Sequence, residues 1–242
     1  NKHVFVEKPL CLDVNEGSNL VDLAKKKKLK LMVGHLLLYH SAFIALKKLI
    51  ISGGIGNIRY IYSNRLSLGK LRKEENALWS FAPHDISMIL SLLEREPLNI
   101  NAFGGYYLTE NVADTTITIM EFSKGVKAHV YVSWLHPFKD QRLVVVGDKG
   151  MATFIDIEEK EKKLLLYKHD VSWDNNIPII EKAEGTPIKY EMNKEPLTLE
   201  CKSFVEWING MKTPPSTGEE GLRVLKVLDK AEKKLKEDTY GK

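Results

Sequence analysis

Cysteine is scarce in this chain. Only two cysteines occur among 242 residues, Cys11 and Cys201, and neither belongs to a CxxC pair. This scarcity excludes a disulfide framework and a cysteine-based zinc site. The histidines show no metal-ligand spacing, and no HExxH motif is present. We therefore predict that the protein holds no metal.

Long hydrophobic runs are also missing. The most apolar stretch, Leu36 to Leu46, is too short to span a bilayer and contains His40. Charged residues interrupt the first positions of the chain, so no apolar core of a secretion signal is recognisable there. These absences predict a cytoplasmic protein with no membrane partner.

The excess of positive charge is small. The formal net charge is +4, and the lysines are scattered or grouped in short runs such as 25–28. Nucleic-acid-binding proteins more often show a concentrated basic face with interleaved aromatic residues, so we predict no nucleic-acid partner. A hydrophobic content of 43% with 28% charged residues fits a globular protein of one large or two smaller domains.

The glycine-rich motif GxGxxG, which turns the backbone around a dinucleotide phosphate, does not occur. The nearest candidates are Gly53, Gly54 and Gly56. They follow a helix-like segment and precede a strand, which is the reverse of the order in a phosphate loop. We interpret them as a helix C-cap and a turn.

The stretch from Lys2 to Leu10 is the most informative one present. His3 to Val6 is a short β-branched and aromatic run, typical of a strand buried on both faces. Glu7 and Lys8 follow where the strand ends, and ligands of open α/β sheets bind outside the carboxyl ends of the strands. Lys8 is therefore a candidate acid/base group, and the alternative is a solvated Glu-Lys pair before an ordinary turn.

A parallel strand–helix–strand unit is predicted over the first part of the chain. Asp13 is a helix N-cap with Glu16 as its capping-box partner, and the helix ends in the lysine run. Leu29 to Val33 is the second strand. The length between the two strands is about the minimum for a parallel crossover.

The rest of the chain predicts a second layer. Strand-like segments are expected at 58–68, 98–108, 115–122, 127–134, 141–146, 151–157 and 163–167, and helices at 42–51, 199–211 and 217–235. Residues 174–185 are polar and irregular, and we expect a loop there. The predicted fold is α/β followed by α+β, in which a mostly antiparallel sheet carries helices on one face.

A second chemical site is predicted at residues 79–85. Pro83 suits the first turn of a helix that runs to about Leu93, which puts His84 at the helix N-terminus. The helix dipole there disfavours the imidazolium and lowers the pKa towards that of a working base. A histidine with a pKa near neutrality suits the task of a general base, which takes a proton from a reacting group. The alternative is a capping or core histidine.

Five segments together resemble the Gfo/Idh/MocA oxidoreductases. They are HVFVEKPL (3–10), LMVGH (31–35), GNIRYI (56–61), LWSFAPHDIS (78–87) and GDKGMATF (147–154). The resemblance implies that residues 1–38 are the C-terminal end of an incomplete NAD(P)-binding Rossmann domain. It also implies that 39–242 form an α+β domain for substrate binding and oligomerisation. About a hundred residues of the family's Rossmann domain are then expected before Asn1.

The resemblance also implies roles for individual residues. Lys8 matches the family's catalytic lysine and His84 its catalytic histidine. The residues expected to border the cofactor, NAD or NADP, are Glu7, Lys8, Pro9 and His35. Many members carry an aspartate four residues before the histidine, where this chain has Ser80. That departure puts a three-residue relay in doubt and leaves Ser80 as a possible helix cap.

The segment at 76–87 is most similar to enzymes that oxidise the 3-hydroxyl of UDP-N-acetylated hexosamines or their uronates. The small-molecule substrate would then be a sugar or nucleotide sugar. Its expected contacts are Arg65, Lys70, Arg72 and Asp85. Asp85 also fits a supporting role, in which it would bind a side chain that contacts the substrate and not the substrate itself. Arginine suits phosphate oxygens, and a flexible solvated loop is the alternative for 70–73. A cyclitol or hexose dehydrogenase and a non-catalytic binding module remain open, and the resemblance implies a homodimer or homotetramer.

Overall fold

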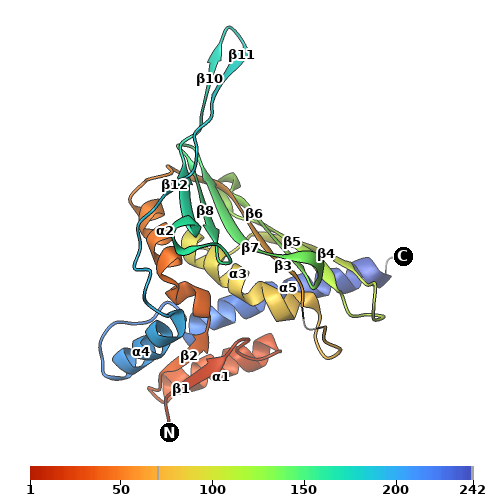
Figure 1. The fold of residues 1–242 in the computed structure, drawn as a ribbon. Helices are drawn as coiled ribbons and strands as arrows, with labels where there is room; N and C mark the ends of the chain where they lie inside the picture. The colour runs from red at the N-terminus through yellow and green to blue at the C-terminus, as the bar shows by residue number, and fades with distance from the viewer. Residues whose placement is uncertain (70, 241–242) are drawn as a thin grey trace.

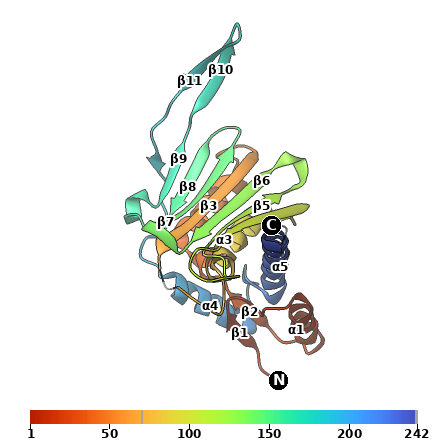
Figure 2. The same cartoon turned by 90° about the vertical axis from the view of Figure 1, so that its right-hand side faces the viewer.

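The computed structural model of the chain describes residues 1–69 and 71–240. A small two-stranded unit at the N-terminus lies below a large sheet, and long helices lie between the two (Figure 1). A narrow hairpin stands off the far end of the sheet (Figures 1 and 2). The α/β and α+β parts expected from the sequence are both present.

The N-terminal unit is the predicted strand–helix–strand. Strand β1 (Val4–Glu7) pairs in parallel with β2 (Leu31–Gly34), and helix α1 (Val14–Lys26) connects them. The Asp13 carboxylate accepts the main-chain N–H groups of Asn15 and Glu16, which satisfies two donors at the start of α1. The expectation that the first strand is buried on both faces is wrong. Val4 is 46% exposed, because the sheet of β1 contains only β2 as its neighbour in the described part of the chain.

The large sheet has eight strands in the order β12-β9-β8-β7-β3-β6-β5-β4. Its strands are β3 (Ile58–Leu68), β4 (Asn99–Gly105), β5 (Thr115–Glu121), β6 (Lys127–Ser133), β7 (Leu135–Gly147), β8 (Met151–Ile155), β9 (Leu164–Tyr167) and β12 (Thr186–Pro187). Neighbours run antiparallel except for β3 and β6, which are parallel. A mostly antiparallel sheet is thus confirmed.

Helices cover one face of this sheet and leave the other open (Figure 2). The helical segments are α2 (Ser41–Ile51), α3 (Ala77–Leu93), α4 (Pro196–Ile208) and α5 (Gly218–Tyr240), with short 3₁₀ turns η1 (Leu36–Tyr39), η2 (Ser123–Gly125) and η3 (Lys160–Lys162). Strand β6 shows the alternation that results, since Ala128 and Val130 are buried while Lys127 is exposed.

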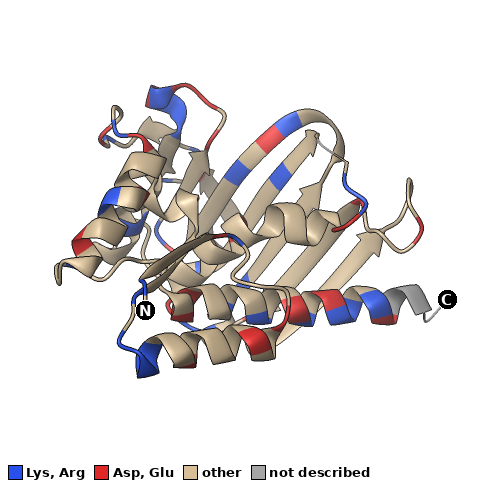
Figure 3. Ribbon diagram, turned by 90° about the horizontal axis from the view of Figure 1, so that it is seen from below, with Lys and Arg blue, Asp and Glu red and all other residues tan. Residues whose placement is uncertain are grey.

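Helix α5 joins the two units. It packs on β2 and α1 at one end and on β4 and α3 along its length. A Cβ atom on Gly221 would lie 2.4 Å from Cγ2 of Val33, so this approach of α5 to β2 depends on glycine. Figure 3 shows Lys and Arg interspersed with Asp and Glu along α5, so the helix has no face of a single charge.

The expectation of a loop over 174–185 is wrong for residues 174–181, which belong to a hairpin. Strands β10 (Asp170–Asp174) and β11 (Ile177–Glu181) form an antiparallel hairpin. Asn175 and Asn176 make its turn, with φ angles of 45° and 67°. Two left-handed residues match the right-handed twist of the flanking strands, and asparagine tolerates that conformation better than most residues.

The described residues were compared with two kinds of feature, a membrane-spanning helix and a metal-binding cluster, and contain neither. Among residues 1–69 and 71–240, no helix combines the length and the apolar character that crossing a bilayer requires. The same part of the chain holds no cluster of three or more His, Cys, Asp or Glu side chains arranged to bind a metal ion. Cys11 and Cys201 are unpaired thiols.

Candidate active site

Lys8 lies just beyond the carboxyl end of β1. The strand ends at Glu7, opposite Gly34 at the end of β2, and the chain then turns through the cis peptide bond between Lys8 and Pro9. The Lys8 ammonium donates a hydrogen bond of 2.8 Å to the main-chain carbonyl of Ser80, in α3. This contact joins the end of the parallel pair to the helix that carries His84.

Helix α3 begins earlier than the sequence indicated. It starts at Ala77, and its N-cap is Asn76, whose side chain accepts the N–H of Trp79. Pro83 therefore lies inside the helix and not in its first turn, and the expectation that Ser80 caps the helix is wrong. A proline at this position removes the N–H that would donate to the Trp79 carbonyl and crowds that turn. Lys8 bonds the next carbonyl along, that of Ser80.

His84 lies in the interior of α3, beside Lys8. Burial lowers the pKa of His84 well below 6.5, and the positive charges of Arg65 and Lys8 act in the same direction. The dipole at a helix N-terminus is thus not the cause, and that part of the prediction is wrong. The Nδ1 atom of His84 is buried without a hydrogen-bond partner among the described residues. The imidazole is therefore neutral near pH 7 and has capacity to bind a proton.

His35 follows β2 and lies in the same cluster. Only 1% of its surface is exposed, and neither ring nitrogen has a hydrogen-bond partner in the described part of the chain. Burial, followed by the charge of Lys8, lowers the pKa of His35 to about 4. His35 also contributes to the lowered pKa of His84, so the structure brings Lys8, His35 and His84 together.

The Lys8 ammonium is the cation of this cluster, and its pKa is lowered. Burial is the main cause. Glu75 and Glu7 oppose the shift, while Arg72 and Arg65 add to it. A lysine held in this way gives up or shares a proton more readily than a solvated one.

Arg65, whose charge acts on His84, forms an ion pair with Asp85. Arg65 Nε donates to one carboxylate oxygen of Asp85 at 2.6 Å, and Ser63 donates to the other at 2.5 Å. Asp85 is 1% exposed and Arg65 is 9% exposed. Both oxygens of the Asp85 carboxylate thus accept hydrogen bonds from side chains of β3. This supports a role for Asp85 in holding Arg65, and not in contacting the substrate itself.

The loop after β3 reaches the cluster through Arg72. Arg72 forms a half-exposed ion pair of 3.0 Å with Glu75, and both residues affect the pKa of Lys8. Lys70, the other predicted contact in this loop, lies outside the described residues.

Sequence reasoning missed Glu200 of α4. This carboxyl is 2% exposed, and its Oε1 atom has no hydrogen-bond partner among residues 1–69 and 71–240. Burial, followed by the charge of Glu7, raises the pKa of Glu200 to about 7. The available signal was an acidic residue within the amphipathic pattern of α4, next to Leu199.

Two profiles of one protein family match the chain. Residues 1–35 match the oxidoreductase family with an NAD-binding Rossmann fold, Gfo/Idh/MocA. Residues 43–153 match the C-terminal domain of the same family.

Individual proteins agree with these matches. The UDP-N-acetylglucosamine 3-dehydrogenase of Acidithiobacillus ferrooxidans is 30% identical over 132 residues, which are 54% of this chain and 41% of that protein. The myo-inositol 2-dehydrogenase of Thermotoga maritima is 24% identical over 98% of this chain and 71% of its own length. A crystal structure from Magnetospirillum magnetotacticum superimposes with a TM-score of 0.81 at 30% identity, over 95% of this chain and 72% of that one.

This chain therefore spans less than half of the first of these relatives and about 70% of the other two. The residues that match the two family profiles, 1–35 and 43–153, include Lys8, His35 and His84. On both profiles and on the shared fold, the chain belongs to the Gfo/Idh/MocA oxidoreductase family.

Proposed function

We propose that this protein is part of an NAD(P)-dependent dehydrogenase that oxidises a hydroxyl of a sugar. The preferred substrate is a UDP-N-acetylated hexosamine or its uronate, oxidised at the 3-hydroxyl. The observation that carries the proposal is the meeting of Lys8 with the helix of His84 at the end of β1, where burial keeps the imidazole neutral. The A. ferrooxidans relative supports the choice of a nucleotide sugar.

The residues at the strand ends fit a nicotinamide cofactor. Both ring nitrogens of His35 are buried without partners among the described residues, so polar groups are available there for a bound molecule. Glu7, Lys8, Pro9 and His35 would border it, as expected from the resemblance. A bound nicotinamide supplies the acceptor for the hydride that leaves the substrate carbon. The cofactor in this proposal is NAD or NADP.

In the proposed reaction, His84 takes the proton of the substrate hydroxyl as the carbonyl forms. Its lowered pKa keeps it unprotonated and ready at neutral pH. The neighbouring charges of Lys8 and Arg65 disfavour the imidazolium, so the proton passes on to solvent readily. Lys8 donates a hydrogen bond to the hydroxyl oxygen, which orients it towards His84. Arg65 and Asp85 hold the floor of the site, and Arg72 is the remaining described candidate for contact with substrate phosphates.

Two other functions have an observation in their favour. A cyclitol dehydrogenase is supported by the T. maritima relative, which matches nearly the whole chain. A non-catalytic module is supported only by Ser80 at the position of the family aspartate. We further propose, on the resemblance alone, that the protein works in the cytoplasm as a homodimer or homotetramer without nucleic-acid or membrane partners.

The test measures NADH formation by the full gene product with UDP-N-acetylglucosamine or myo-inositol as substrate. Lys8→Met and His84→Asn should each lower kcat by about 100-fold or more while the circular dichroism spectrum stays unchanged. Lys2→Met, at an exposed residue, and His136→Asn, at a half-buried residue of β7, serve as matched controls and should keep full activity. Unchanged rates in either site variant would refute the assignment. Turnover of myo-inositol alone would favour the cyclitol enzyme.

A further inference from the structure

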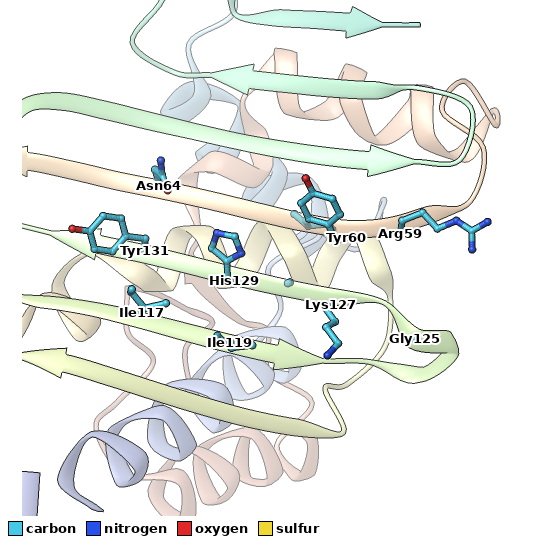
Figure 4. Close-up of a pocket in the computed structure, with 11 residues that line it drawn as sticks. Arg59, Tyr60, Asn64, Ile117, Ile119, Gly125, Lys127, His129 and Tyr131 are labelled. Atoms are coloured by element: carbon cyan, nitrogen blue, oxygen red, sulfur yellow. The ribbon is translucent and has the colours of Figure 1, made fainter. Parts of the chain in front are cut away.

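The open face of the large sheet carries a shallow cavity of about 660 Å³, between β3, β5 and β6. Its lining is mainly apolar and aromatic and includes Tyr60, Ile119 and Tyr131 (Figure 4). Among the described residues, none that lines this cavity has a buried side-chain polar atom without a hydrogen-bond partner. Glu200 of α4 does have such an atom, and its surroundings are therefore the more informative place.

Helix α4 lies along one face of the parallel pair β1 and β2 (Figure 2). The ring centroids of Phe5 and Phe204 are 5.4 Å apart. Phe5 and Glu7 point to the same face of β1, because side chains two positions apart in a strand share a face. Glu200 lies one helical turn before Phe204, so it projects from the same side of α4, towards the end of β1 at Glu7.

Gly34 leaves room for the carboxylate of Glu7. The register pairs Glu7 with Gly34 across the two strands. A Cβ atom on Gly34 would lie 3.2 Å from Oε2 of Glu7, which is tighter than ordinary van der Waals contact. Because this position has no side chain, the Glu7 carboxylate can lie across the end of β2, on the face that α4 covers.

The surroundings of Glu200 favour its protonated form. The side chain is 2% exposed, and Oε1 has no hydrogen-bond partner in the described part of the chain. After burial, the charge that acts on Glu200 is that of Glu7, and both raise its pKa. Tyr39 of η1 is a further titratable neighbour, and burial, with a smaller contribution from Glu200, raises its pKa to about 12. The Lys30 ammonium lies over the ring of Trp207, two turns farther along α4.

The Glu7 carboxylate is a suitable acceptor for the proton of Glu200. Hydrogen bonds from an O–H group to a carboxylate are short and strong. Two carboxyl groups at one site keep a proton between them, because ionising both brings like charges together. Glu7 directly precedes Lys8, whose ammonium reaches the Ser80 carbonyl at 2.8 Å, so fixing Glu7 also fixes the start of that contact.

We propose that Glu200 and Glu7 hold one proton between them, and that Glu200 thereby positions the end of β1 that carries Lys8. Glu200 carries the proton and donates it in a hydrogen bond to Glu7, directly or through one water molecule. Loss of the proton leaves two anions that repel each other and loosen the strand end. Glu200 is thus a positioning residue, and its effect on turnover rests on the dehydrogenase proposed above.

Infrared spectroscopy of the full gene product tests the shared proton without any substrate. A protonated carboxyl has a carbonyl-stretch band that a carboxylate lacks. The wild type should show this band at about pH 6 and lose it by about pH 8.5, and Glu200→Gln should lack it. In Glu7→Gln the band should disappear about one pH unit lower, because the neighbouring anion is gone.

Glu206→Gln is the matched control for this titration. Glu206 lies in α4 and forms a partly exposed ion pair of 3.7 Å with Lys202, so its loss should leave the band unchanged. A band that titrates at the same pH in Glu7→Gln and in the wild type would overturn the shared proton. So would the absence of a band specific to Glu200 at about pH 6.

Turnover tests the positioning role. Glu200→Leu removes the donor and should lower kcat by about tenfold or more with KM nearly unchanged, while the circular dichroism spectrum stays the same. Glu200→Gln keeps an N–H donor and should retain about half of kcat or more at about pH 6. Relative to the wild type, its kcat should rise about threefold or more by about pH 8.5, where the wild type has lost the proton.

Glu206→Leu is the control for these rates and should stay within about twofold of the wild type. Equal losses in Glu200→Leu and Glu200→Gln, or parallel pH profiles of Glu200→Gln and the wild type, would overturn the positioning role. A full gene product that turns over no sugar would refute the proposed function, whereas the infrared titration decides the shared proton by itself.

Discussion

Replacing Arg65 by methionine should lower the free energy of unfolding by about 3–5 kcal/mol, since it leaves a buried carboxylate without its cation. Asp85 is 1% exposed and lies 2.6 Å from Arg65 Nε. Methionine keeps the aliphatic stem of Arg65, so the loss is mainly that of the charge. The hydrogen bond from Ser63 remains, but a hydroxyl dipole does not replace a positive charge.

Replacing both partners of this ion pair together should destabilise the protein less than replacing Arg65 alone. Removing both charges, in Arg65→Met with Asp85→Leu, leaves no uncompensated ion and should recover at least half of the loss. Urea denaturation followed by circular dichroism at pH 7.5 gives the four free energies of the cycle. Lys25→Met, which breaks the exposed pair with Glu219 at 3.3 Å, is the control and should cost less than about 1 kcal/mol. The reasoning fails if Arg65→Met costs no more than this control, or if the double variant loses the sum of the single losses.

Three further outcomes follow from the same geometry. Glu200→Gln should stabilise the fold by about 2–3 kcal/mol at pH 8, because burial raises the pKa of Glu200 to about 7 and the wild type must bury a charge above it. The gain should vanish by about pH 3.5, below the ordinary pKa of 4.5, where the carboxyl is protonated in both the folded and the unfolded state, and denaturation at the two pH values checks this. His35→Leu should reduce the loss of stability between pH 6.5 and 4, because the lowered pKa of about 4 means that only the unfolded chain binds this proton there. Thermal unfolding across that range measures it, and parallel curves for variant and wild type would speak against it. Asn76→Ala should cost about 1 kcal/mol and Ser80→Ala clearly less, because Asn76 caps α3. Equal losses in urea denaturation would show that the cap is misassigned.

The elements that the sequence predicted well are those set by local patterns. Alternating residues marked β3 and β6, and the Asp13 cap marked the start of α1, because such signals act within a few residues. The neighbours of each strand were not predictable in this way. That β3 lies between β7 and β6, with one parallel pairing, depends on contacts between residues far apart in the chain.

Two errors have a shared physical origin. Pro83 was interpreted as a helix start because proline is common there, yet α3 is held by packing on the sheet and continues through it. The Asn175-Asn176 turn was overlooked because asparagine pairs are weaker turn signals than Asn-Gly. In both cases a general preference was outweighed by the surroundings of one residue. The pairing of Arg65 with Asp85 was missed for a related reason, since spacing alone does not reveal which side chains of two elements meet.

Ser80 stands where many members of the family carry an aspartate. The family aspartate would place a carboxylate one helical turn before His84, whereas here the ammonium of Lys8 bonds the main-chain carbonyl of that residue. Every amino acid supplies this carbonyl, so the serine side chain is not needed to hold Lys8 against α3. A carboxylate at this position would also raise the pKa values of Lys8 and His84, which burial and the nearby cations now lower. The substitution is therefore compatible with a neutral His84, and it removes an anion from the site without removing the contact that joins Lys8 to the helix.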